Sequence, residues 1–448
     1  MHPSAEKLNN RYIIGLSFIS ALGGYLFGFD FAVISGALPF LRTTFALDAW
    51  WEGFLTGSLA LGCMLGCMLA GGIAERYGRR PGLMLSACIF AVSSLAIALS
   101  GSLLFFVVMR FAAGIGVGMA SMLCPMYIAE ISPANVRGRN VAINQLTVVI
   151  GILVTNLVNY FLAGGGDDAW RWMFGLGAVP SLVFLAGVFF LPESPRWLVK
   201  NGRSDEASRV LGRVGPPHYV QETLAAIRSS LSGHARTPFR AVFAKAVRPA
   251  IIAGIVLAVF QQLCGINVVF NYTSTIFESV GADLDRQLFE TVAIGLVNLV
   301  FTVLAMLLVD RLGRKPLMLA GSAGLCVLYV VLATLLKQHA SAGIISAAVL
   351  SAISLYAISL APVTWVLISE IFPNHIRSAA SSLAIVCLWA AYFVLVFTFP
   401  VMAEKLGTYG PFYVYAGVCL LGFLFVLARV TETKGQTLEE LEENLIRH

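Results

Sequence analysis

Two ionisable residues lie well inside long apolar stretches of this chain, Asp30 in the first stretch and Arg110 in the fourth. A charge at mid-bilayer costs about 2.5–3.5 kcal/mol on insertion scales, so such residues are usually paired and functional. A carboxyl group takes up or releases a proton as its contact with a guanidinium changes. None of the six histidines lies within such a stretch, which leaves Asp30 as the candidate proton carrier. The alternative is a permanent ion pair that only orients helices.

Amides and aromatic rings form a second set of candidate positions within the apolar stretches. An amide both donates and accepts hydrogen bonds, and a flat ring packs against an apolar face. The set therefore suits an uncharged solute with many hydroxyls, such as a sugar. Lone amides in membrane helices also bond to neighbouring helices, which is the alternative for Asn298. The candidate solute-binding residues are Phe27, Gln145, Gln261, Gln262, Asn267, Asn298, Trp365 and Trp389.

The elements that hold these residues are predicted to be membrane-spanning helices. Of the 448 residues, 58% are hydrophobic and only 12% are charged, which is too little polar surface for a water-soluble protein. Two groups of six apolar stretches, each long enough to cross a bilayer, flank a polar segment. The stretches cover 13–41, 53–74, 81–101, 103–128, 141–163, 172–192, 250–280, 287–309, 316–336, 344–369, 379–403 and 411–430.

The distribution of basic residues predicts the orientation of these spans. Most of the 30 Lys and Arg residues fall in the loops that lie inside when the N-terminus is inside, so both termini are expected in the cytoplasm. A multi-pass protein of the inner (plasma) membrane follows, with the first span retained rather than cleaved as a signal peptide. The net charge of +6 is spread over the ends of the spans, which argues against a nucleic-acid partner.

The chain is expected to form four units. These are an N-terminal six-helix bundle (1–192), a cytoplasmic linker (193–249), a C-terminal six-helix bundle (250–430) and a cytoplasmic tail (431–448). The linker has a helix start at Ser204 and an amphipathic run from Val220 to Leu231, and Thr437 begins a capping-box pattern in the tail. Short surface helices are therefore predicted, and simple solvated connectors are the alternative.

An internal repeat relates the two bundles. The sequence ERYGRR at 75–80 recurs as DRLGRK at 310–315, and EISPANVR at 130–137 recurs as EIFPNHIR at 370–377. Glu193, in PESP, has its echo at Glu432, so all three echoes lie roughly 240 positions apart and in the same order. Parallel repeats of six spans predict a solute site near the bilayer midplane, between the halves.

Together these motifs resemble the sugar porter family of the major facilitator superfamily, and the resemblance covers essentially the whole chain. Within the family, the chain is most similar to bacterial proton-coupled sugar symporters of the xylose and glucose type. The motifs that carry the resemblance are GGIAERYGRR (71–80), ESPRW (193–197), QQLCGIN (261–267), DRLGRK (310–315) and ETKG (432–435).

The family resemblance implies import of a monosaccharide, a hexose or a pentose, together with a proton by alternating access. No enzyme activity, cofactor or metal is implied, and a monomer is expected. The alternatives are an uncoupled sugar facilitator, a polyol or inositol symporter and, more remotely, a non-transporting sugar sensor. Within the family Asp30 matches the aspartate of proton-coupled members, and Arg110 matches the arginine of the fourth span.

Three positions in the expected sugar site depart from the family pattern. Asn271 replaces the tyrosine that relatives place after the seventh-span Asn-x-x-x run. Leu388 replaces a polar amide just before Trp389, and Tyr392 stands where an asparagine is common. Each unmatched sugar hydroxyl costs about 1–3 kcal/mol, so these departures leave the identity of the sugar open.

Charged residues at the cytoplasmic helix ends are expected to act as a gate, paired when the inside is closed and separated when it opens. Each exposed pair contributes only about 0–1 kcal/mol, but several together bias a nearly balanced equilibrium. Topology and solvation alone are the alternative. The candidate gate residues are Glu75, Arg76, Glu130, Arg137, Glu193, Arg196, Asp310, Arg311, Glu370 and Arg377.

Overall fold

The computed structural model describes residues 8–133, 136–232, 242, 244, 247–372, 376–430 and 432. In these ranges all regular secondary structure is helical, and 12 segments are long and apolar enough to cross a membrane. The predicted all-α membrane protein with six plus six spans is therefore confirmed.

The N-terminal half contains the first six spans, the last of which is built from α6 and α7. Its helices are α1 (Asn10–Phe45), α2 (Ala49–Arg76), α3 (Arg79–Ala98), α4 (Leu103–Ile131), α5 (Arg137–Leu162), the 3-10 turn η1 (Ala163–Gly165), α6 (Ala169–Gly175) and α7 (Ala178–Phe190). Three short helices follow, and these confirm the predicted surface helices: α8 (Pro195–Lys200), α9 (Ser204–Val214) and α10 (Pro217–Ser232).

The C-terminal half repeats the six-span pattern with two interrupted spans. Its helices are α11 (Arg248–Leu263), α12 (Ile266–Asn271), α13 (Thr273–Glu278), α14 (Leu284–Leu312), α15 (Arg314–Lys337), α16 (Ala342–Ile358), α17 (Leu360–Glu370), α18 (Arg377–Leu406) and α19 (Gly410–Arg429). The predicted tail helix after Thr437 lies outside the described residues.

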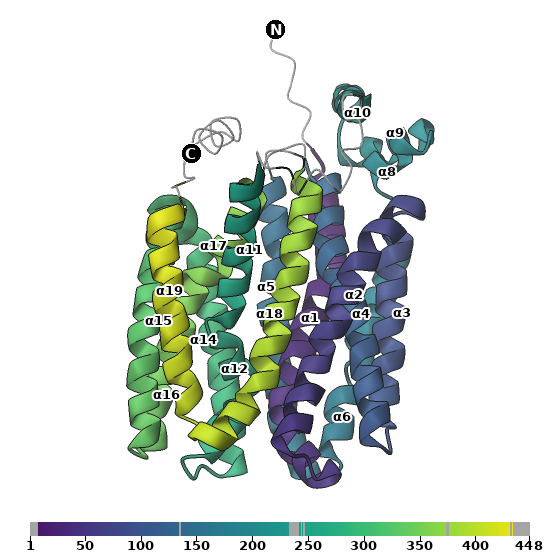
Figure 1. Ribbon diagram of the computed structural model, residues 1–448. Coiled ribbons are helices and arrows are strands. Elements are labelled where there is room, and N and C mark those ends of the chain that lie inside the picture. Colours follow the sequence, from purple (N-terminus) through teal and green to yellow (C-terminus); the bar gives the residue numbers. More distant parts are fainter. Residues whose placement is uncertain are drawn as a thin grey trace.

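The two halves stand side by side, with α8–α10 beyond one end of the bundle (Figure 1). Within the N-terminal half, α1 packs on α5 and α2 packs on α4, whereas α15 packs on α19 in the C-terminal half. The halves meet mainly where α2 contacts α18 and where α5 contacts α14. We refer below to the α8–α10 end and to the opposite end of the bundle.

The internal repeat reappears as a repeated helix start at the α8–α10 end. Gly78 and Gly313 precede α3 and α15 with φ values of 108° and 88°, a backbone conformation that favours glycine. The Glu193 carboxylate accepts from the N–H of Arg79 at 2.9 Å. The Glu432 carboxylate likewise accepts from the N–H of Arg314 at 3.0 Å. A carboxylate from the end of each half thus binds the positive N-terminus of its third span.

The seventh span is interrupted at Gly265. Gly265 has a φ of 91°, and a Cβ at this position would lie 2.5 Å from the Tyr415 ring, so a side chain is excluded for both reasons. The tenth span breaks between Ile358 and Leu360, because Pro362 lacks an N–H and its ring clashes with the carbonyl four residues earlier. Both interruptions expose backbone groups inside the C-terminal half, near the candidate amides.

Candidate functional site

Asp30 of α1 and Arg110 of α4 form a buried ion pair inside the N-terminal half. Arg110 Nη1 donates to Oδ1 of Asp30, and both residues are almost fully buried. The Arg110 guanidinium also lies 5.3 Å from the centre of the Phe174 ring. Among the described residues, Oδ2 of Asp30 has no hydrogen-bond partner. One carboxylate oxygen is therefore held by the arginine and the other is available to a proton, which is the chemistry expected of a proton carrier.

Amides of the seventh span form a continuous hydrogen-bonded set, which we call the amide relay: Gln261, Gln262, Asn267 and Asn271. Gln262 Nε2 donates to Oε1 of Gln261 at 2.5 Å, and Asn267 Nδ2 donates to Oε1 of Gln262. The break at Gly265 makes this possible, because it returns Asn267 to the side occupied by Gln262. Asn271 Nδ2 then donates to the backbone oxygen of Asn267 at 2.6 Å. The relay presents donors and acceptors in a buried setting, as recognition of hydroxyls requires.

The Gln261 end of the relay contacts the tenth span. Gln261 Nε2 donates to the hydroxyl of Tyr356, at a distance of 2.5 Å, close to the break before α17. Tyr356 was not singled out from the sequence, because a tyrosine in an apolar run carries no pattern that marks it as a partner of an amide about 95 positions away.

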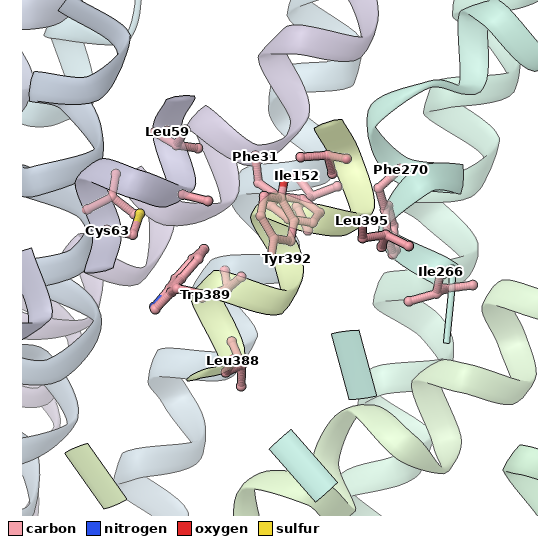
Figure 2. Packing of buried hydrophobic residues seen from close by; sticks show 14 of the residues in the cluster. Phe31, Leu59, Cys63, Ile152, Ile266, Phe270, Leu388, Trp389, Tyr392 and Leu395 are labelled. Atoms are coloured by element: carbon pink, nitrogen blue, oxygen red, sulfur yellow. The ribbon is translucent and has the colours of Figure 1, made fainter. Parts of the chain in front are cut away.

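Aromatic side chains of α1 and α18 lie beside the relay. Phe27 and Trp389 meet edge to face, with ring centroids 5.6 Å apart. Phe31 contacts Phe270 at 5.8 Å and Tyr392 at 5.5 Å. Figure 2 shows Phe31, Phe270, Trp389 and Tyr392, with Tyr392 over Phe31 and Trp389 beside Cys63 of α2. The cluster thus joins the N-terminal half, which holds Asp30, to the C-terminal half, which holds the amides.

The other candidate solute-binding residues lie apart from this set. Gln145 on α5 and Trp365 on α17 are exposed, whereas Asn298 on α14 is buried. In the part of the chain that the structure describes, none of the three shares a hydrogen bond or ring contact with the amide relay. Their predicted contact with a solute stays a prediction.

Two acidic gate candidates at the α8–α10 end, Glu130 and Glu75, bind residues that are not themselves gate candidates. Glu130 binds Arg79 through two hydrogen bonds of 2.9 and 2.7 Å and accepts from Ser194 Oγ at 2.5 Å. Sequence reasoning missed Arg79, although it lies within the repeated ERYGRR motif. Glu75 lies 3.5 Å from Lys200 of α8.

The remaining gate candidates divide into exposed, capping and undescribed side chains. Arg76, Arg137 and Arg196 are exposed, and Arg76 lies over the Tyr77 ring. Glu193 binds the start of α3, where burial raises its pKa and the backbone N–H groups that it accepts from oppose that shift. The side chains of Asp310, Arg311, Glu370 and Arg377 lie outside the described part of the structure.

A second ionic group, which the sequence did not reveal, joins the halves at the opposite end of the bundle. Arg42 at the end of α1 binds Glu52 of α2 through contacts of 2.6 and 2.7 Å. It also donates to Glu278 at 2.6 Å and to Thr275 at 2.7 Å, both on α13 of the other half. Ser274 of α13 donates to the backbone oxygen of Ser35 on α1 at 2.7 Å. These contacts join the two halves at this end of the bundle.

A hollow of about 430 Å³ between α18 and α19 is separate from this site. Its lining includes Leu263, Val394, Met402 and Val418 and is almost entirely apolar. Such a surface offers too few hydrogen-bonding groups for a solute with many hydroxyls and instead suits a lipid chain.

Twelve spans in two repeated halves, with a buried ion pair and a polar relay near their junction, define a membrane transporter of the alternating-access class. Residues 16–445 match the family model described as "Sugar (and other) transporter". This chain belongs to the sugar transporter family.

Similar proteins of known name cover nearly the whole chain. The D-xylose-proton symporter of Escherichia coli (strain K12) is 37% identical, over 97% of this chain and 96% of its own length. The arabinose-proton symporter of Bacillus subtilis (strain 168) is 35% identical, with 98% and 97% covered. A structure of the E. coli xylose transporter XylE in a partially occluded inward open conformation matches with a TM-score of 0.86. It is 35% identical in sequence and covers 95% of this chain and 100% of that chain. These similar proteins are transporters rather than enzymes.

Proposed function

We propose that this protein imports a monosaccharide, a hexose or a pentose, together with a proton. The observation that carries the proposal is the buried Asp30–Arg110 pair with one unpartnered carboxylate oxygen. Charged residues inside membrane spans are costly and usually mark substrate, ion or proton pathways, and an uncoupled carrier has no need of an ionisable group there. The names of the similar proteins, which include xylose and arabinose proton symporters, support the same proposal.

Uptake by the purified protein in liposomes tests this function. An inward proton gradient is expected to drive accumulation of at least one labelled hexose or pentose, and collapse of the gradient with a protonophore should reduce uptake to equilibration. Equal uptake with and without the gradient would favour the uncoupled facilitator. A response to polyols or inositol alone would favour the polyol symporter, and no transport of any solute in the panel would favour the sensor.

We further propose that both termini and the α8–α10 end are cytoplasmic and that the monomer is the transporting unit. The amide relay, with Phe27, Gln145, Asn298, Trp365 and Trp389, contributes to the solute site. The bundles of residues 1–192 and 250–430 rock against one another about this site, and the linker 193–249 connects them. In this orientation the Arg42 contacts close the outer side, as expected of an inward-facing state.

Neutralising Glu278 should shift the protein toward its outward-facing state. The Glu278→Gln side chain keeps its size but loses its charge, so the Arg42 bond between the halves weakens while Arg42–Glu52 remains. Glu278 is 56% exposed, and a pair of this kind contributes about 0–1 kcal/mol, which shifts the populations up to about fivefold. Electron-resonance distances between labels at the outer ends of the two halves measure this shift.

Asp168→Asn is the matched control for this measurement. It removes an ion pair with Arg171 at the same end, but both of these residues belong to the N-terminal half. The control should leave the label distances unchanged. An unchanged distribution in Glu278→Gln, or an equal shift in both variants, would contradict the role of Arg42 as a contact that holds the outer side closed.

A further inference from the structure

Asn271 and Tyr392, two of the three positions that depart from the family pattern, are hydrogen-bonded to each other. The hydroxyl of Tyr392 on α18 donates to Oδ1 of Asn271 on α12 at 3.1 Å, and both residues are buried. The sequence places an amide where similar proteins have a phenol, and a phenol where an asparagine is common. The structure places these two departures at the two ends of a single hydrogen bond.

The Asn271 end of this bond belongs to the amide relay. Asn271 uses Oδ1 to accept from Tyr392 and Nδ2 to donate to the backbone of Asn267. Asn267 in turn is bonded to Gln262. A solute that binds Gln262 or Asn267 must therefore disturb or reinforce hydrogen bonds that extend to Tyr392.

The Tyr392 end of the bond belongs to the aromatic cluster beside the proton pair. The Tyr392 ring lies 5.5 Å from that of Phe31, which directly follows Asp30 in the chain, and 5.7 Å from that of Trp389 (Figure 2). Tyr392 thus contacts the amide relay on one side and Phe31, the neighbour of Asp30 in the chain, on the other.

We propose that the Tyr392–Asn271 hydrogen bond positions the amide relay against α1 and thereby couples sugar binding to the protonation of Asp30. The proposal rests on the proposed function and names a positioning pair within its site. A solute that reorients the relay moves Asn271, and the ring of Tyr392 passes this movement to Phe31 and hence to the segment that carries Asp30. Removing the hydroxyl should weaken the link between the two events more than it weakens either one.

The bond has a plain structural explanation as well, which the experiment must separate from coupling. A buried tyrosine hydroxyl needs a hydrogen-bond partner. By donating to Asn271, Tyr392 joins α18 to α12 whether or not the bond serves coupling. Tyr272 provides the comparison. It lies next to Asn271, is equally buried, and donates to the backbone oxygen of Val396 on α18 at 2.7 Å. Loss of its hydroxyl removes a contact between the same parts of the protein without touching the amide relay.

The test uses Tyr392→Phe and Tyr272→Phe in the full chain in liposomes, with two readouts for the sugar that the native protein accumulates best. Counterflow exchange reports solute binding and movement without a proton gradient, and the accumulation ratio at several pH values reports coupling. Tyr392→Phe should lose accumulation about fivefold more than it loses counterflow, the equivalent of one hydrogen bond, with a flattened pH profile. Tyr272→Phe should keep the native accumulation ratio and pH profile.

The reciprocal variant, Asn271→Tyr with Tyr392→Asn, provides a rescue experiment. It exchanges the amide and the phenol between the two positions and so keeps one of each across the contact of α12 with α18. Each single change should lose accumulation, and the double variant should recover it to within about twofold, because neighbouring changes of this kind are not additive.

Three outcomes would overturn the proposal. These are native accumulation and pH dependence in Tyr392→Phe, an equal loss in Tyr272→Phe, and a double variant no better than its single changes. Absence of counterflow in the native protein would instead contradict the proposed transport function, so the two failures are distinguishable.

Discussion

Asp30→Asn should abolish accumulation of the solute against its gradient and leave counterflow exchange within a few fold of the native rate. Asparagine keeps the shape of the side chain but cannot carry a proton, so solute movement loses its driving force. The binding groups of the amide relay lie in the other half of the molecule and are not altered. Proton-driven uptake and counterflow in the same liposomes measure the two effects separately.

The loss of the carboxylate also leaves Arg110 without its counterion. Breaking a buried ion pair from one side costs about 3–5 kcal/mol, so thermal unfolding of Asp30→Asn should occur at lower temperature than in the native protein. The double variant Asp30→Asn with Arg110→Gln removes both charges and should recover part of that stability without recovering accumulation. Recovery of stability together with continued loss of accumulation would separate the proton role from the structural one.

Asp168→Asn serves as the control for this experiment as well. It removes a carboxylate of the N-terminal half that is paired at 2.7 Å with Arg171 but exposed to solvent. This variant should accumulate solute normally. An Asp30→Asn protein that still accumulated solute would contradict proton coupling through this residue and would support the facilitator.

Periodic and repeated features of the structure could be predicted from the sequence. Span number follows from apolar length, since about twenty apolar residues are needed to cross a bilayer. The weak echo of Glu193 at Glu432 was also informative, because both carboxylates bind the start of the third span in their half. The break at Gly265 was predictable because glycine and the spacing of the amides marked it locally.

Contacts between distant segments could not be predicted in the same way. Arg42 and Glu278 are about 236 positions apart, and a single charge at a helix end looks the same whether it meets water or another helix. Glu130 likewise binds Arg79 rather than the arginine nearest to it in its own motif, because packing of α3 against α4 determines which guanidinium is in reach. Asn271 and Tyr392 were visible as separate departures, but only the fold shows that they are hydrogen-bonded to each other.

Gln262→Ala should weaken sugar binding more than the loss of any other single amide. Gln262 is the only member of the relay whose side chain both donates to one relay side chain and accepts from another, among the described residues. Its removal takes away a potential hydroxyl contact and leaves Gln261 and Asn267 without their shared partner. Each unmatched buried group costs about 1–3 kcal/mol, so the Kd should rise between about fivefold and 150-fold.

Gln145→Ala and Asn201→Ala provide graded comparisons for this variant. Gln145 is exposed on α5 and outside the relay, so its loss removes one contact and should raise the Kd less than the loss of Gln262. Asn201 lies just after α8 and donates to the backbone of Trp197, far from the site, so its loss should leave the Kd unchanged. Calorimetric titration with the best transported sugar gives all three values. A Gln262→Ala protein with a Kd within about twofold of native would mean that the relay holds the seventh span together rather than holding the sugar.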